Sequence, residues 1–149
     1  MMVRILQFIA MLLTALYFVP GGAHVLELAN KIDLDQDPYM TVQQIYRGWA
    51  LLGLLPIAAI AVNGLAALTM RSQPMPMICA AAAAVLLSLG LAIFFTWTFP
   101  VNQITSNWTV VPANWQTLRV QWEFSHAANA LVTFLALCSS IASSLLWSR

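Results

Sequence analysis

Four long apolar segments dominate the pattern of hydrophobic and polar positions along the chain. They cover about residues 5–28, 47–70, 75–100 and 124–147. Each exceeds the roughly 20 residues that an α-helix needs to cross a hydrocarbon core about 30 Å thick. None of them alternates apolar and polar faces with the 3.6-residue period of a helix on a water-soluble protein. The pattern therefore predicts four membrane-spanning helices.

The connections between these segments predict how the helices are arranged. A tight turn, Arg71-Ser72-Gln73-Pro74, joins the second and third segments, whereas residues 29–46 and 101–121 form long polar connections. Short links make sequential helices antiparallel neighbours, so an up-down-up-down bundle is expected in which the first helix also contacts the fourth. Asn114 is a favourable N-cap residue, so the fourth helix should begin near Trp115. The composition of the connection before it, with Trp108, Val110, Val111 and Trp115, favours order, so this connection should cap the site. We expect one all-α domain, residues 1–149, with helices at about 5–28, 47–70, 75–100 and 115–147.

Proline and glycine are expected to shape two of these helices. Pro20-Gly21-Gly22 interrupts the first segment, where the glycines would let another backbone approach closely, and Phe99-Pro100 is expected to end the third. The first segment also resembles a secretory signal, but its apolar character continues beyond the small residues. It is therefore interpreted as a retained first helix.

Composition and charge agree with a membrane location. Hydrophobic residues make up 61% of the chain and charged residues 7%, against about a quarter charged in soluble domains. A net charge of +1 without a basic stripe gives no indication of a nucleic-acid partner, so the lipid bilayer is the expected partner. Basic residues are equal in number on the two sides of the membrane. On the side that holds both termini, they lie in short tails and one short turn that contain no acidic residue. We therefore expect a multi-pass protein of a plasma or inner membrane with both termini cytoplasmic; the sequence leaves the oligomeric state open.

Two matched pairs of ionisable residues are the strongest candidates for chemistry. They are His24-x-x-Glu27 in the first helix and Glu123-x-x-His126 in the fourth. A spacing of three places each pair on one helical face. Because the two helices run in opposite directions, both histidines lie at one depth and both glutamates about 4.5 Å nearer the non-cytoplasmic surface. Since ionisable groups in a membrane normally face the bundle interior, the pairs are predicted to share one site between the helices.

Two arginines are expected to join this site. Arg119 precedes Glu123 by four residues, an ion-pair spacing, and Arg47 opens the second helix at a similar depth. In a purely structural interpretation, these guanidinium groups neutralise Glu27 and Glu123. In a catalytic interpretation, a histidine or glutamate transfers protons and an arginine stabilises an anion.

Two further interpretations involve a metal. The Glu-x-x-His pairs resemble the ligands of di-iron bundles, but the second and third helices contain no Asp or Glu to complete that set. At most one metal ion would fit, held by both histidines and one or two glutamates. A haem held by His24 and His126 is the remaining alternative. No metal or other cofactor is required by the leading interpretation.

The C-terminal half carries a resemblance to a known family. Asn102, followed by Asn114-Trp115-x-x-Leu118-Arg119-x-x-Trp122-Glu123-x-x-His126, resembles the signature of the anthrone oxygenase-like family of small four-helix membrane proteins. The resemblance implies oxidation of an anthrone to an anthraquinone, a reaction with which no cofactor is firmly associated. Most bacterial members have no assigned function.

The resemblance also implies roles for individual residues. His126 or His24 would be the base, Arg119 the cation, and Trp115 and Trp122 the walls of the substrate site, to which the motif adds Asn102. The spacing and depth of the ionisable residues add Glu27 and Glu123 to the catalytic group and Arg47 to the substrate site. We therefore expect a cofactor-independent oxygenase-like oxidoreductase that acts on an aromatic or lipid-like substrate. The alternative is a non-enzymatic membrane protein that binds a small hydrophobic ligand or stabilises a partner.

Overall fold

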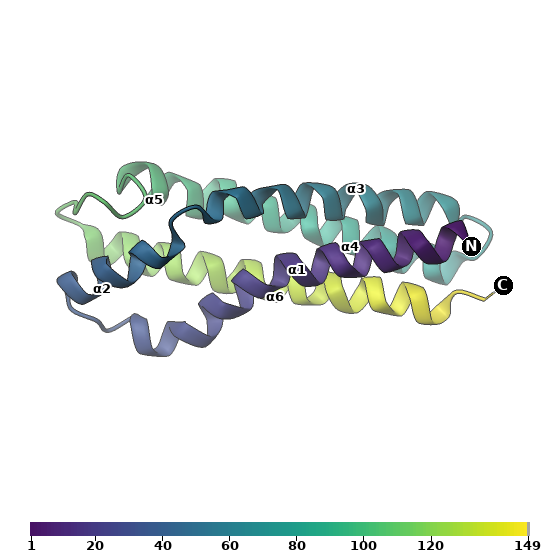
Figure 1. The fold of residues 1–149 in the computed structure, drawn as a ribbon, viewed down its shortest axis with the longest axis horizontal. Coiled ribbons are helices and arrows are strands. Elements are labelled where there is room, and N and C mark those ends of the chain that lie inside the picture. The colour runs from purple at the N-terminus through teal and green to yellow at the C-terminus, as the bar shows by residue number, and fades with distance from the viewer. Residues whose placement is uncertain (149) are drawn as a thin grey trace.

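The computed structural model describes residues 1–148, and four long helices form its body (Figure 1). They are α1 (Met2–Lys31), α3 (Leu54–Thr69), α4 (Pro74–Ile93) and α6 (Trp115–Leu146). Helix α1 packs against α3 and α6, and α4 packs against the same two helices. This confirms the predicted up-down-up-down bundle and the contact between the first and last helices. Both ends of the chain lie at the same end of the bundle.

The long helices are built to lie in a membrane. The segments Met2–Lys31, Trp49–Thr69, Pro74–Ile104 and Trp115–Leu146 are each long and apolar enough to cross a bilayer. Their outward faces expose large apolar side chains, among them Leu54, Val85 and Leu131. Exposing these apolar faces to water would cost free energy, whereas contact with lipid does not. The protein is therefore a multi-pass integral membrane protein.

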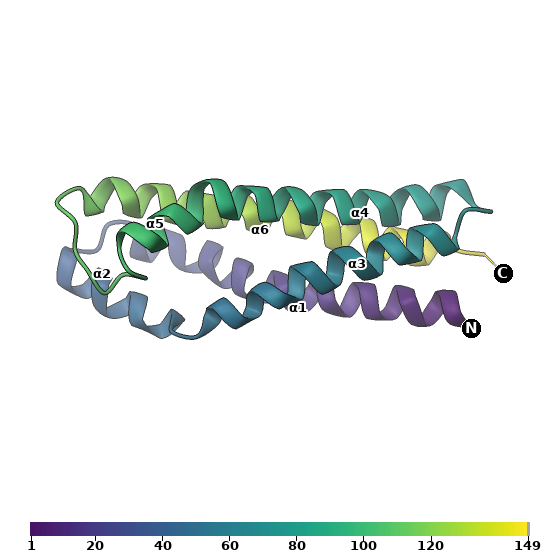
Figure 2. The same cartoon turned by 90° about the horizontal axis from the view of Figure 1, so that it is seen from above.

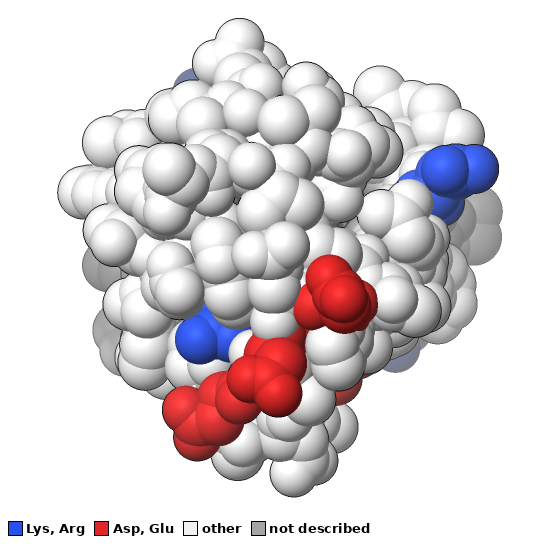
Figure 3. Space-filling model, turned by 90° about the vertical axis from the view of Figure 1, so that its left-hand side faces the viewer, with Lys and Arg blue, Asp and Glu red and all other residues white. Residues whose placement is uncertain are grey.

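Shorter elements gather at the end of the bundle that lies away from the termini (Figures 1 and 2). They are α2 (Gln36–Gln43), η1 (Gln44–Tyr46), η2 (Trp49–Gly53), η3 (Phe94–Thr98) and α5 (Phe99–Ile104). Most of the surface at this end is uncharged, and acidic side chains collect along one part of it (Figure 3). These elements build the candidate site.

The expected interruption of the first helix at Pro20 does not occur. Helix α1 is continuous from Met2 to Lys31 with Pro20 inside it. The neighbouring glycine does allow a close approach, as expected: a Cβ added to Gly21 would lie 3.3 Å from Cβ of Ala130 on α6. The tight packing of α1 on α6 holds the helix together through the position where proline removes a backbone hydrogen bond.

The expected end of the third helix at Phe99-Pro100 is also wrong. The chain widens into a π-helical turn, η3, in which the Phe99 N–H donates to the carbonyl of Phe94. Because proline lacks an N–H, it fits at the start of a new helical segment, and α5 continues to Ile104. Widened turns of this kind often mark functional sites.

Buried polar side chains tie the four helices to one another along the bundle. In the absence of water, hydrogen bonds of this kind help transmembrane helices to associate. The bonded pairs are Gln7 with the Ser143 carbonyl at 3.2 Å, Asn63 with Thr14 at 3.3 Å, Asn129 with Tyr17 at 3.1 Å and Thr98 with Ser125 at 2.7 Å.

Candidate functional site

The two predicted histidine–glutamate pairs meet between α1 and α6. The imidazole rings of His24 and His126 are packed together, with ring centroids 4.2 Å apart and planes inclined by 31°. The indole of Trp122 contacts both, at 5.0 Å from His24 and 4.2 Å from His126. The two histidines therefore meet between α1 and α6, as their spacing in the two helices predicts.

The two glutamates are joined by a residue that the sequence analysis did not assign to the site. The ammonium group of Lys31 lies 3.4 Å from Oε2 of Glu27 and 3.2 Å from Oε1 of Glu123. The side chains of Lys31 and Glu123 are buried, and that of Glu27 is partly exposed. One ammonium group thus bridges two carboxylates from different helices. The expected neutralisation of these carboxylates by Arg47 and Arg119 is wrong.

The direction of helical side chains explains this difference. Side chains of an α-helix lean toward its N-terminus. Lys31 follows Glu27 by four residues, so it leans back over that carboxylate and on toward Glu123. Arg119 precedes Glu123 by four residues, so it leans away from the carboxylate. The spacing of four residues is the same whether the acid or the base comes first in the chain. An ion pair on a helix is more favourable when the glutamate precedes the lysine, as Glu27 precedes Lys31.

Arg119 and Arg47 have other partners. The Arg119 guanidinium donates to the carbonyl of Leu34 at 2.6 Å and lies over the rings of Trp115 and Tyr39, 4.8 Å and 5.4 Å from their centroids. It thus fastens α6 to the loop after α1. Arg47 is exposed and donates to Oε1 of Gln44 at 3.5 Å.

Two tyrosines outside the membrane-spanning segments complete the network around Lys31. The hydroxyl of Tyr39 donates to Oε1 of Glu123 at 2.9 Å, and that of Tyr46 donates to Oε2 of Glu27. Lys31 also donates to the Tyr46 oxygen at 2.6 Å. Burial, and after it the neighbouring carboxylate, raises the pKa of both Tyr39 and Tyr46. Both phenols therefore remain hydrogen-bond donors at neutral pH.

A cavity of about 690 Å³ opens beside the histidines. Its walls come from α1, the segment 43–57, the end of α4 through α5, the loop at 106–109 and α6. Five of the nine predicted site residues line it: His24, Arg47, Asn102, Trp122 and His126. Glu27, Trp115, Arg119 and Glu123 do not. The cavity is large enough for a ligand of several fused rings.

Asn102 and Trp122 form part of the cavity wall together. The indole Nε1 of Trp122 donates to Oδ1 of Asn102 at 2.7 Å, which links α6 to α5. The bond brings together two residues of the predicted substrate site that are 20 positions apart in the chain. It also fixes the plane of the indole that contacts both imidazoles.

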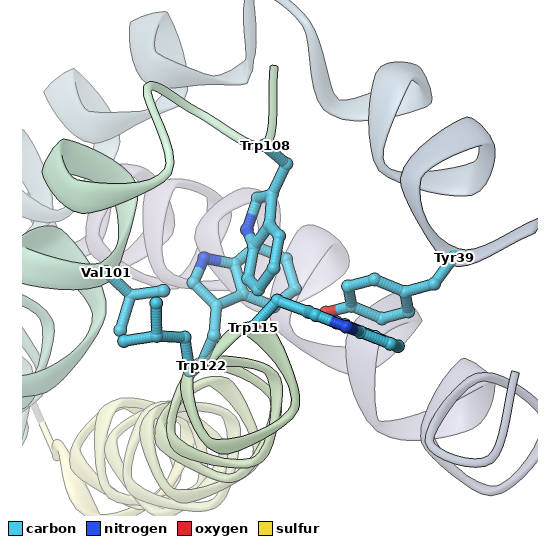
Figure 4. Packing of buried hydrophobic residues seen from close by; sticks show 6 residues of the cluster. Tyr39, Val101, Trp108, Trp115 and Trp122 are labelled. Carbon is cyan, nitrogen blue, oxygen red and sulfur yellow. The ribbon is translucent and has the colours of Figure 1, made fainter. Parts of the chain in front are cut away.

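An aromatic cluster closes the end of the bundle over the cavity, as the loop composition predicted. Trp108 and Trp115 are buried, with 3% and 8% of their surfaces exposed. Trp108 packs edge-on against Tyr39 and Trp122 (Figure 4). Helix α6 begins at Trp115, as expected, but the Asn114 side chain makes no capping bond. Instead the Asn114 carbonyl accepts from the N–H groups of Thr117 and Leu118.

The metal alternatives do not fit this geometry. Within residues 1–148, no three His, Cys, Asp or Glu side chains come together as ligands of one ion. Lys31 occupies the space between the two carboxylates, so they cannot share a cation with the histidines. The imidazoles are packed ring against ring at 4.2 Å, which leaves no room for a haem between them.

Sequence reasoning missed Lys31, Tyr39, Tyr46 and Gln43. The spacing Glu27-x-x-x-Lys31 was a signal for the first of these, since it is the favoured order for an ion pair on one helical face. No sequence pattern around Tyr39, Gln43 and Tyr46 indicates a place in the site. They lie there because the connection between α1 and α3 folds back over it.

No family model, curated protein or solved structure matches the chain. The fold and site define an integral membrane four-helix protein. Its cavity, which aromatic side chains cap, is lined by the histidine pair His24 and His126. Beside the cavity, Lys31 bridges the carboxylates of Glu27 and Glu123.

Proposed function

We propose that this protein is a membrane-embedded, cofactor-independent oxygenase that oxidises an aromatic or lipid-like substrate with an acidic C–H bond. The observation that carries the proposal is the contact of the paired imidazoles of His24 and His126 with the 690 Å³ cavity. A neutral imidazole in contact with a bound C–H group can accept its proton as a general base. The resemblance of the C-terminal motif to the anthrone oxygenase-like family agrees with this choice.

An apolar hollow on the outside of the bundle supports a hydrophobic substrate. A second hollow of about 420 Å³ lies on the outside of the bundle and is lined by apolar residues of α1 and of segment 49–55. It shares Pro20, Trp49 and Leu52 with the wall of the cavity. These three side chains therefore form the wall between the outer hollow and the cavity, and a hydrophobic molecule would enter from the lipid where they move apart.

The proposed reaction converts a methylene group between aryl rings into a ketone. An imidazole removes a proton from the CH₂ group, and the carbanion transfers one electron to O₂. The carbon radical and superoxide combine into a peroxide anion, which regains a proton. Loss of the second C–H proton with cleavage of the O–O bond then gives the ketone and water. One O₂ is consumed, one oxygen atom enters the product, and the other leaves as water.

His126 and Arg47 are the chain's groups best placed for these steps. His126 lines the cavity and is only partly buried, so its imidazole can meet a bound C–H group. Arg47 is the arginine in the cavity wall and can stabilise a delocalised anion. Arg119 takes no part in this proposal, because it is engaged with Leu34 outside the cavity.

Ligand binding without chemistry is the second candidate. One observation favours it: Glu27 and Glu123 are held by Lys31 and the tyrosines and do not line the cavity. The ionic network would then be structural, and the cavity would store or present a hydrophobic molecule.

Oxygen consumption with anthrone distinguishes these functions. Purified protein in lipid nanodiscs should form anthraquinone faster than protein-free nanodiscs, and His126→Asn should lower the rate by about 100-fold or more. Phe124→Leu is the matched control, because Phe124 is exposed on the same helix. Equal rates for the unmodified protein and His126→Asn would contradict the enzymatic proposal. Tight binding of anthrone without turnover would favour the second candidate.

A further inference from the structure

Arg47 gives the cavity wall its charge. Apart from the two histidines, it is the basic residue of the wall, and no acidic residue within residues 1–148 lines the cavity. The carboxylates of Glu27 and Glu123 lie outside the wall and are bridged by Lys31. In a largely apolar pocket, a single charged group commonly fixes the orientation of a ligand. The charge of this wall therefore favours a ligand with a negatively charged group.

The Arg47 guanidinium is available to such a ligand. It is exposed and donates to Oε1 of Gln44 at 3.5 Å, whereas both ion pairs in the described part of the chain belong to Lys31. A guanidinium has five N–H donors, and a carboxylate or phosphate can accept two of them in parallel. Most of the hydrogen-bonding capacity of Arg47 can therefore serve an anion.

The exposed part of the cavity wall is polar at one end and apolar at the other. Its polar side chains all lie outside the four membrane-spanning segments; they are Gln44, Arg47, Ser106, Asn107 and Thr109. Its apolar residues lie within those segments; they are Ala50, Gly53, Ile57, Phe95 and Phe99. A molecule that matches this wall has a polar head at the membrane surface and a hydrophobic body inside the bundle.

The two polar segments of the wall meet beside Arg47. Gln44, which accepts the bond from Arg47, donates from its Nε2 to the carbonyl of Trp108 at 3.2 Å. This bond places the turn 106–109 one glutamine side chain away from the guanidinium. Asn107 is exposed in that turn, with a φ angle of 55° that asparagine tolerates better than most residues. Its amide can donate to an anion held by Arg47.

We propose that Arg47 and Asn107 bind the anionic head of an amphiphile whose hydrophobic body fills the cavity. The head is a carboxylate or a phosphate, since a guanidinium binds both in the same geometry. The body extends along the apolar wall to the histidines, and the cavity of about 690 Å³ has room for it. This inference rests on the proposed function for the use of the cavity, to whose substrate it adds an acidic group. It requires binding alone and no oxidation.

Three probes with one hydrophobic body test the site on protein in phosphatidylcholine nanodiscs. Pyrenebutyrate is anionic, its methyl ester is neutral, and pyrenebutylamine is cationic. Energy transfer from tryptophan to pyrene measures binding, because Trp49, Trp108 and Trp122 line the cavity. Pyrenebutyrate should bind about tenfold more tightly than the ester, which corresponds to one charge-assisted hydrogen bond. The amine should bind most weakly, and added salt should reduce the preference for the carboxylate.

Variants assign this preference to individual side chains. Arg47→Gln removes the charge, so it should abolish the preference and leave the affinity for the ester unchanged. Arg71→Gln is the matched control, because Arg71 is exposed in the turn between α3 and α4, at the other end of the bundle. Asn107→Gly removes the amide but suits the positive φ angle, so it should weaken pyrenebutyrate by about threefold and spare the ester.

Phosphatidylglycerol in the nanodiscs distinguishes two sources of the anion. If the head group of a bilayer lipid occupies the site, this lipid should displace pyrenebutyrate from the unmodified protein and not from Arg47→Gln. If a free amphiphile is the ligand, both proteins should respond to phosphatidylglycerol alike. Either response is compatible with the anionic site only where the preference for pyrenebutyrate is present in its absence.

The remaining outcomes separate binding from folding and from catalysis. Equal affinities for the three probes, no binding of any probe, or equal losses for pyrenebutyrate and its ester in Arg47→Gln would overturn the anionic site. Circular dichroism should show the same helical content for every variant. Preference for pyrenebutyrate without anthrone oxidation would retain the site and reject only the oxygenase. Anthrone oxidation without that preference would reject only the site.

Discussion

The ammonium group of Lys31 lies 3.2 Å from a carboxylate oxygen of Glu123, and both side chains are almost completely buried. The contact joins the last turn of α1 to the first half of α6, beside the histidine pair. Because the same ammonium group also binds Glu27, one lysine bridges two carboxylates. The stability of this end of the bundle should therefore depend on Lys31 more than on any arginine.

Replacing Lys31 should destabilise the fold strongly. Lys31→Met leaves the buried Glu123 carboxylate without its cation, at a cost of about 3–5 kcal/mol. Unfolding in mixed micelles, followed by circular dichroism, measures this loss. Arg71→Met is the control, because Arg71 is exposed in the turn between α3 and α4. Adding Glu123→Gln to Lys31→Met should recover part of the stability, and a strictly additive double variant would refute the pairing.

Arg119 should matter through its stacking and its bond to the backbone. Arg119→Lys keeps the charge but loses the planar group that lies over Trp115 and Tyr39, so we expect a loss of about 1–3 kcal/mol. The double-mutant coupling of Arg119 with Glu123 should be smaller than that of Lys31 with Glu123. The same unfolding measurements give both couplings. A larger coupling for Arg119 would restore the ion pair that its spacing suggested.

A side chain added at Gly90 of α4 should disturb the packing of α4 against α6. A Cβ there would lie 2.6 Å from Oδ1 of Asn129, whose amide is bonded to Tyr17 on α1. Gly90→Ala should therefore destabilise the protein by about 1–3 kcal/mol. Gly64→Ala is the matched control, because nothing lies within 4 Å of its added Cβ and alanine favours a helix. Thermal unfolding of the two variants should move in opposite directions, and equal shifts would contradict the packing.

The sequence was sufficient for the bundle because length and apolar composition alone decide where a chain can span a membrane. The meeting of His24 with His126 was also predictable, since it needs only two spacings and two opposite helix directions. The ion-pair partner of Glu123 was not predictable from spacing, because the choice between Lys31 and Arg119 depends on the direction in which a helical side chain leans. Gln43 could not be placed either, since its position follows from the route of the segment between α1 and α3.

Alkaline pH should destabilise the protein through Tyr46. Its phenol is protonated in both folded and unfolded states below about pH 10. Above that pH the unfolded chain releases a proton that the folded chain retains, because its pKa is raised in the folded state. The free energy of unfolding then falls by up to about 1.4 kcal/mol per pH unit for this residue.

Tyr46→Phe isolates this effect. The variant should be less stable at pH 8, because it loses bonds to Glu27 and Lys31, yet its stability should fall less steeply above pH 10. Phe18→Leu, which changes no titrating group, should keep the original slope. Identical slopes for Tyr46→Phe and the unmodified protein would mean that the phenol titrates normally in the fold.

Isotope incorporation tests the central claim that the histidine-lined cavity carries out oxidation by O₂. Purified protein in nanodiscs is given anthrone under oxygen-18-labelled O₂ in ordinary water, and the product is analysed by mass spectrometry at early times. We predict anthraquinone with one labelled oxygen atom, formed well above the protein-free rate and lost in His126→Asn. Product without label, or labelled product formed equally fast without the protein or by His126→Asn, would contradict the account.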